Sequence, residues 1–130
     1  MEIRKSRAIG RISVTSYNAQ SHDDGGAFTV ADVQVTEEFF GGLVGAGSAR
    51  FISAKELVNG AMHFAGIEKF LGKLGDRSGS FLMRNSGAVT GDVLHSTWHV
   101  IEGSGTEELA GLRGEGGCTP QGYTLDYWFE

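Results

Sequence analysis

The sequence predicts an all-β protein: a single closed antiparallel barrel of about eight strands, with almost no helix, in one domain over residues 1–130. Three observations support this prediction. Apolar and polar side chains alternate along most of the chain, which is the period of a strand with one buried face. Glycine-rich breaks recur at short intervals and divide the chain into segments of strand length. The chain has 21 glycines and one proline, and glycines within strands suit the sharp bends of a small barrel.

The clearest strand lies at residues 31–39, where four apolar side chains share one face with a single acidic residue, Glu37, and polar side chains fill the other. The same alternation predicts strands at residues 8–17, 27–39, 43–54, 60–75, 78–88, 91–102, 112–118 and 122–130. Only residues 106–110 have local helical character. Consecutive strands joined by short loops predict a meander, and closing it into a barrel removes the exposed edges.

Charged side chains indicate which face of each strand points outward. Lysine side chains are rarely buried, so the face of the strand that carries Lys69 and Lys73 points outward. The opposite face, with Glu68, therefore points into the barrel. By the same argument, Arg11, Arg50 and Arg84 mark the outward faces of their strands. The expected inward residues are Gly10, Ile12, Val14, Ser16, Leu43, Gly45, Gly47, Ala49, Phe51, Met62, Phe64, Gly66, Glu68, Phe70, Phe81, Met83, Asn85, Tyr123, Leu125, Tyr127 and Phe129. Strands 91–102 and 112–118 are ambiguous, and the bulk of Trp98 places it inside.

The predicted lumen is apolar and aromatic, with a few polar side chains, and this combination is typical of a small-molecule site. A carboxylate in such a wall has a raised pKa, which suits a general acid or base, so Glu68 is the candidate catalytic residue. Asn85 and the tyrosines are able to hydrogen-bond a carbonyl or an oxyanion. The candidate ligand-binding residues are Glu37, Phe64, Phe70, Met83, Asn85, Trp98, Tyr123 and Tyr127.

Composition excludes several classes of function. The net charge of −5 gives no electrostatic footprint for nucleic acid, and no apolar stretch is long enough to cross a membrane as a helix. The single Cys118 fits a reducing, cytoplasmic setting. His95 and His99 on one strand lie about 13 Å apart at ~3.3 Å per residue, too far to share a zinc ion. We therefore expect no metal, no cofactor and a cytoplasmic location.

Five short segments, four of which contain glycine, carry a resemblance to a known family: Gly66-Ile67-Glu68, residues 77–81, residues 103–106, residues 109–116 and residues 123–127. Over nearly the whole chain the sequence resembles an uncharacterised bacterial family of domains of unknown function whose members have the allene oxide cyclase barrel-like fold. The resemblance implies an eight-stranded barrel and a homodimer. Asn85 stands where many members carry His, and Glu102 where many carry Pro, so a catalytic His there would be missing from this chain.

Three functions remain open at this point. The first is a barrel that binds a small apolar or amphipathic molecule, and the second is a cofactor-independent isomerase or cyclase that uses Glu68. The third is a structural homodimer with a filled core, joined through Trp128 or the face of His95 and His99. A filled lumen favours the third, and an open lumen with Glu68 paired, for example to Arg113, favours the first. An open lumen with a free Glu68 of raised pKa favours the second.

Overall fold

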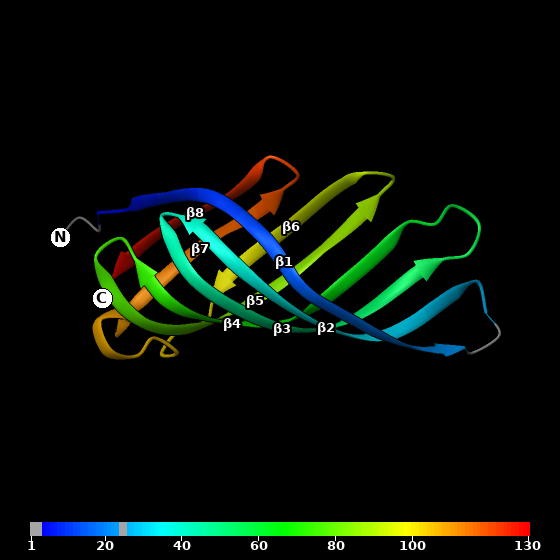
Figure 1. Cartoon of the computed structure of the whole chain (residues 1–130), viewed down its shortest axis with the longest axis horizontal. Helices are drawn as coiled ribbons and strands as arrows, with labels where there is room; N and C mark the ends of the chain where they lie inside the picture. Colours follow the sequence, from blue (N-terminus) through cyan, green and yellow to red (C-terminus); the bar gives the residue numbers. More distant parts are fainter. Residues whose placement is uncertain (1–3, 24–25) are drawn as a thin grey trace.

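The computed structural model describes residues 4–23 and 26–130, and it confirms the all-β prediction. Eight antiparallel strands follow one another around a closed barrel in chain order, so that β1 pairs with both β2 and β8 (Figure 1). The elements are β1 (Ser6–Asp23), β2 (Phe28–Gly41), β3 (Leu43–Glu56), β4 (Met62–Leu74), β5 (Arg77–Thr90), β6 (Val93–Val100), η1 (Glu107–Leu109), β7 (Leu112–Thr119) and β8 (Gly122–Phe129).

Most strand ends agree with the alternation pattern to within two residues. The largest difference is β1, which continues to Asp23 instead of ending at residue 17. The segment expected to be helical forms one short 3-10 turn, η1. β1 and β2 are paired from Gly10 opposite Gly41 to Asp23 opposite Thr29, and β3 continues beside β2 as far as Glu56 opposite Phe28.

One end of the barrel, called the packed end below, is filled by its own side chains. Its buried members are Ala8, Phe39, Leu43, Phe70, Leu74, Phe81, Met83, Trp98, Val100, Leu109, Leu112, Tyr123 and Leu125. The segment between β6 and β7 closes this end, because the Thr106 amide donates to the Ser80 carbonyl and Leu109 is fully buried beneath it. Filling of this kind is usual for small barrels.

Glycines let neighbouring strands approach closely where the packed end curves. Gly45, Gly72 and Gly79 lie opposite one another across β3, β4 and β5. A Cβ at any of the three would meet backbone atoms of a neighbouring segment. The excess of glycine therefore serves the curvature of the barrel, as its position inside predicted strands suggested.

The other end is less completely enclosed. β8 pairs with β1 only along Ser6–Gly10, and β6 pairs with β7 only along Ser96–His99. Beyond Gly10, β1 is paired with β2 alone. The two short final strands thus complete the ring around the packed end, and they leave the wall open between β1 and β6 farther along.

A β-bulge in β1 changes which side chains of that strand face inward. Val14 pairs with Glu37, but the next paired residue is Ser16, so Thr15 is an extra residue. A single extra residue reverses the alternation beyond it. Tyr17 consequently faces the lumen and Ser16 is exposed, so the expectation that Ser16 points inward is wrong.

The residues on the outside of the barrel agree with the outward faces that the charged side chains predicted. Lys69, Lys73, Arg84 and the pair His95 and His99 are exposed on the outside. Trp128 is half-buried, with the Lys5 ammonium 4.9 Å from the centre of its ring. The homodimer through Trp128 or the histidine face stays a prediction, and light scattering at tens of micromolar protein is its test.

Candidate functional site

A cavity of about 180 Å³ lies inside the barrel beyond the packed end, in the part that we call the hollow end. Its wall is mostly aliphatic and aromatic. The lining residues are Ile12, Val14, Tyr17, Val33, Val35, Glu37, Phe51, Ser53, Met62, Phe64, Glu68, Asn85, Val89, Leu94, Ser96, Trp98 and Cys118. A cavity of roughly 150 Å³ is large enough for benzene, so this one takes a molecule of about one ring.

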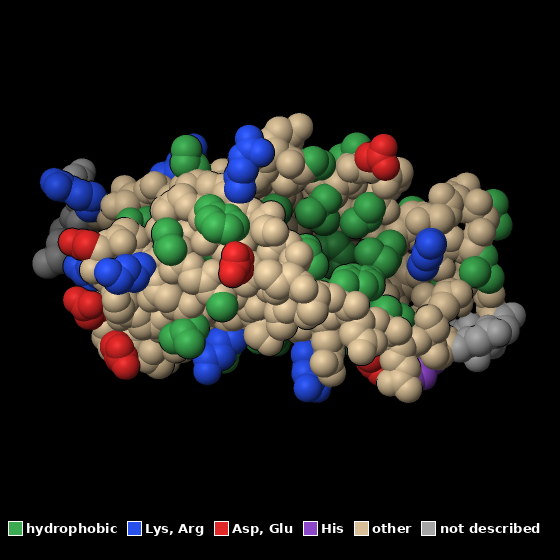
Figure 2. All heavy atoms as spheres, viewed as in Figure 1, with side chains coloured by type: hydrophobic (Ala, Val, Ile, Leu, Met, Phe, Trp, Pro, Cys, Tyr) green, Lys and Arg blue, Asp and Glu red, His purple; other side chains and the backbone are tan. Residues whose placement is uncertain are grey.

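The cavity reaches the surface through the open part of the wall. Figure 2 shows a hollow ringed by hydrophobic side chains right of centre, between the paths of β1 and β6 in Figure 1. Val14 and Tyr17 of β1 line the cavity and are each 58% exposed, so they belong to its rim. An apolar molecule can therefore enter through the seam between β1 and β6.

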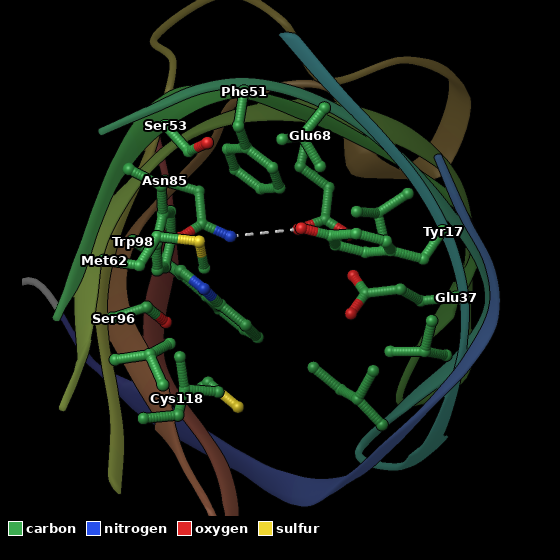
Figure 3. Close-up of a pocket in the computed structure, with 17 residues that line it drawn as sticks. Tyr17, Glu37, Phe51, Ser53, Met62, Glu68, Asn85, Ser96, Trp98 and Cys118 are labelled. Carbon is green, nitrogen blue, oxygen red and sulfur yellow. Dashed lines mark hydrogen bonds between the residues drawn. The ribbon is translucent and has the colours of Figure 1, made fainter. Parts of the chain in front are cut away.

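Glu68 is fully buried in the cavity wall, and only one of its oxygens is paired. Oε1 accepts a hydrogen bond from Asn85 Nδ2 at 3.2 Å (Figure 3). Oε2 has no hydrogen-bond partner among the described residues. Gly47 makes room for this oxygen, because a Cβ at that position would lie 2.5 Å from Oε2.

Burial raises the pKa of the Glu68 carboxyl to about 9, because the charged form would lose its water. Glu37 raises the pKa further, first through a side-chain hydrogen bond with the Glu68 carboxyl and then through its charge, and the hydrogen bond from Asn85 partly opposes the rise. In Figure 3, Glu37 points into the cavity toward Glu68. The Glu68 side chain is thus a neutral acid at pH 7, and Oε2 is available as a hydrogen-bond donor.

Two further polar atoms of the wall are buried without a partner among the described residues: the indole Nε1 of Trp98 and Oδ1 of Asn85. Asn85 and Trp98 lie directly opposite each other on β5 and β6. The Trp98 ring stacks on Tyr123 and meets Phe39 edge-on, with ring centroids 5.7 Å and 6.1 Å apart. These contacts fix the indole at the boundary between the packed end and the cavity.

Cys118 also lines the cavity, and its thiol is unreactive in this setting. Burial raises its pKa to about 11, and the carboxylates of Glu37 and, above about pH 9, of Glu68 raise it too. A thiol with a raised pKa is a weak nucleophile at neutral pH. Within residues 4–23 and 26–130, His, Cys, Asp and Glu side chains form no group of three that could hold a metal ion.

The structure brings five of the nine predicted site residues together around the cavity: Glu37, Phe64, Glu68, Asn85 and Trp98. The other four, Phe70, Met83, Tyr123 and Tyr127, lie in or against the packed end. The Tyr123 hydroxyl is engaged there, accepting from the Leu43 amide at 2.8 Å and donating to the Phe40 carbonyl at 2.8 Å.

Sequence reasoning missed several cavity residues, above all Tyr17 and Cys118. The bulge that turns Tyr17 inward cannot be recognised from the alternation of side chains. Cys118 lies on a strand whose inward face the alternation does not determine. The suggested partner of Glu68 is also wrong: Arg113 bonds the exposed carboxylates of Glu130 at 3.0 Å and Glu102 at 3.4 Å.

The fold and the site together define a class: a small antiparallel β-barrel with a hollow apolar end and one buried acid in its wall. The chain belongs to the family described as protein of unknown function (DUF3224), whose model matches residues 8–130. It is similar to a crystal structure of a DUF3224 protein of unknown function from Shewanella oneidensis MR-1. That structure has 25% sequence identity and a TM-score of 0.78, and the match covers 99% of each chain. No curated protein matches the chain.

These matches agree with the family expected from the glycine-containing segments. A helix long and apolar enough to span a membrane is absent from the described part of the chain.

Proposed function

We propose that this chain binds a small, largely apolar molecule in the hollow end of its barrel. The observation that carries the proposal is the accessible, mostly apolar cavity, in which Glu68 is paired with Asn85 through Oε1 and leaves Oε2 unpaired among the described residues. A buried polar atom without a partner costs stability, about 1–3 kcal/mol. A ligand that pairs with Glu68 offsets this cost, and the surrounding apolar wall provides the rest of the binding energy.

The seam between β1 and β6 supports the proposal, because it connects the cavity to solvent without unfolding of the barrel. Ile12, Val14 and Leu94 line both the cavity and the adjoining surface pocket at the seam. Such an entrance favours exchange of a ligand over permanent enclosure of a structural group.

The test fills the cavity by substitution. Ser53 is buried in the wall, so a leucine there would project into the hollow and occupy it. Ser53→Leu is expected to abolish binding of ethylbenzene, a one-ring probe, as followed by NMR shifts of backbone amides. Ser48→Leu places the same side chain on the outer face of the same strand and is the matched control. A wild type that binds none of the three one-ring probes ethylbenzene, acetophenone and benzoate would contradict the proposal.

One observation favours a second function, that of a cofactor-independent isomerase. Glu37 points toward Glu68 within reach of a side-chain hydrogen bond, and this places two carboxyl groups with different surroundings side by side in the cavity wall. Glu37 would remove a proton from the carbon next to a carbonyl, while Glu68 would hydrogen-bond the carbonyl oxygen that receives the electron pair. In a β,γ-unsaturated ketone, return of the proton from Glu37 to the γ-carbon of the dienolate would shift the double bond into conjugation, restore the carbonyl and complete the isomerisation.

Deuterium uptake tests this second function. In D2O, the wild type would exchange the methyl hydrogens of acetophenone for deuterium faster than buffer does, as measured by proton NMR. Glu37→Gln would lose the acceleration while still binding the ketone. An exchange rate equal to that in buffer would leave ligand binding as the function.

A further inference from the structure

The inner wall of the cavity carries two hydrogen-bond donors that lack protein partners among the described residues. One is Oε2 of the neutral Glu68 on β4, since Oε1 is occupied by the Asn85 amide. The other is Nε1 of Trp98 on β6. Asn85 on β5 lies between them, because it pairs with Gly66 on one side and with Trp98 on the other.

The wall thus leaves two donors unpaired among the described residues, beside one unpaired acceptor, Oδ1 of Asn85, and an acceptor atom of a ligand would satisfy both donors. An indole N–H can only donate, and a protonated carboxyl whose carbonyl oxygen is already bonded can only donate through its hydroxyl. A carbonyl oxygen has two lone pairs and accepts from two donors at once. These two donors therefore fit a ligand with a carbonyl oxygen at this position better than a ligand with an apolar group there.

The charge of Glu37 and the volume of the cavity further restrict the class of ligand. The negative charge of Glu37, which points into the same cavity, disfavours an anionic ligand such as a carboxylate. A volume of about 180 Å³ accommodates one substituted ring with little to spare.

We propose that the cavity selects a neutral carbonyl compound of about one-ring size, whose oxygen accepts hydrogen bonds from Glu68 and Trp98. This inference rests on the proposed binding function and adds the chemical class of the ligand. In this proposal Asn85 is a positioning residue, because its amide binds Oε1 of Glu68 and leaves Oε2 as the free oxygen of the carboxyl.

Three probes of nearly equal size separate the possibilities: ethylbenzene, acetophenone and benzoate, titrated at pH 7 and followed by backbone amide NMR shifts. A cavity without donors would favour ethylbenzene about tenfold or more, because the ketone would lose its water without compensation. We expect acetophenone to bind at least as tightly as ethylbenzene, and benzoate to bind at least tenfold more weakly than acetophenone. Acetophenone is also expected to move the indole N–H resonance of Trp98 downfield.

Two variants remove one donor each. Trp98→Phe keeps an aromatic ring without the N–H, and Glu68→Leu replaces the acid by an apolar side chain. Each is expected to lower the ratio of acetophenone to ethylbenzene affinity about fivefold, the effect of one hydrogen bond. The ratio cancels changes of cavity volume, and either variant alone suffices if the other does not fold. Trp128→Phe, at the second tryptophan outside the cavity, is the matched control and keeps the wild-type ratio.

The outcomes distinguish the inference of a carbonyl ligand from the proposed ligand-binding function on which it rests. A wild type that prefers ethylbenzene by tenfold, or variants that keep the wild-type ratio, would overturn the carbonyl inference and leave ligand binding intact. Absence of binding by all three probes would overturn both.

Discussion

The packed and hollow ends of the barrel are built largely from the same strands, yet only the packed end is filled by its own side chains. On β4, Phe70 is fully buried in the packed end, whereas Phe64, six residues earlier on the same face, is half-buried beside the cavity. The difference follows from strand length. β7 and β8 have 8 residues each and reach the cavity only at Cys118, whereas β1 has 18 and continues past them. Unequal strands thus give one barrel a rigid base and an accessible cavity.

The largest expected effect compares one substitution at the two ends. Phe39→Ala in the packed end removes a side chain in contact with Phe70, Trp98 and Tyr123, and we expect a loss of about 3–5 kcal/mol in the free energy of unfolding. Phe51→Ala beside the cavity is expected to cost less than half as much, because the ring is already partly exposed and borders empty space. Urea denaturation measures both. Equal losses would show that the two ends are equally well packed.

A second prediction concerns the pH dependence of stability, which the buried acid of the hollow end should dominate. The pKa of Glu68 is about 9 in the folded chain and near 4.5 when unfolded, so the unfolded chain releases its proton first as the pH rises. Glu68 therefore stabilises the fold most below pH 4.5, and this contribution falls as the pH rises toward 9, by about 1 kcal/mol per pH unit between 5 and 8.

Glu68→Gln is the matched comparison, because it keeps the shape of the side chain and cannot ionise. Its free energy of unfolding, measured by urea denaturation at several pH values, is expected to lack the slope attributed to Glu68. Parallel curves for wild type and variant would show that Glu68 does not titrate with a raised pKa.

A third prediction separates the tyrosine of the packed end from ligand binding. Tyr123→Phe removes the hydroxyl that bonds the Leu43 amide and the Phe40 carbonyl, and it leaves the buried amide unpaired. We expect a loss of about 1–3 kcal/mol in stability, with unchanged affinity for ethylbenzene. Thermal melts and the NMR titration check the two parts. Weaker binding with unchanged stability would return Tyr123 to the ligand site predicted from sequence.

The smallest effect on stability is expected at Cys118, which reports on access to the hollow end. Because burial raises the pKa of its thiol to about 11, its reaction with N-ethylmaleimide at pH 8 should be about a hundredfold slower than that of an exposed cysteine. Bound acetophenone should slow it further, since Cys118 lines the cavity. Mass spectrometry follows the modification. A rate equal to that of free cysteine would mean that the seam is wider than described.

Alternation along the sequence predicted the fold and the inward direction of Glu68 and Asn85, because a period of two identifies faces without any knowledge of distant contacts, whereas Trp98 was placed inside by its bulk. It did not predict how far along the barrel axis each residue lies. Phe64 and Phe70 share a face, and so do Asn85 and Met83, but only the first of each pair reaches the cavity.

That division depends on the lengths of β7 and β8 and on the segment around Leu109, which closes the packed end. Tyr17 was missed for a different reason, since an inserted residue such as Thr15 can reverse the alternation without changing the composition of a strand.

The short ladder between β1 and β8 also has a consequence for the folding rate. Every other ladder joins strands that are neighbours in the chain, but this one joins residues such as Arg7 and Asp126, which are 119 positions apart. Loop-closure entropy must be overcome before such distant contacts stabilise the chain. We therefore expect closure of the ring between β1 and β8 to be the slow step of folding, after the seven hairpin-like pairs have formed.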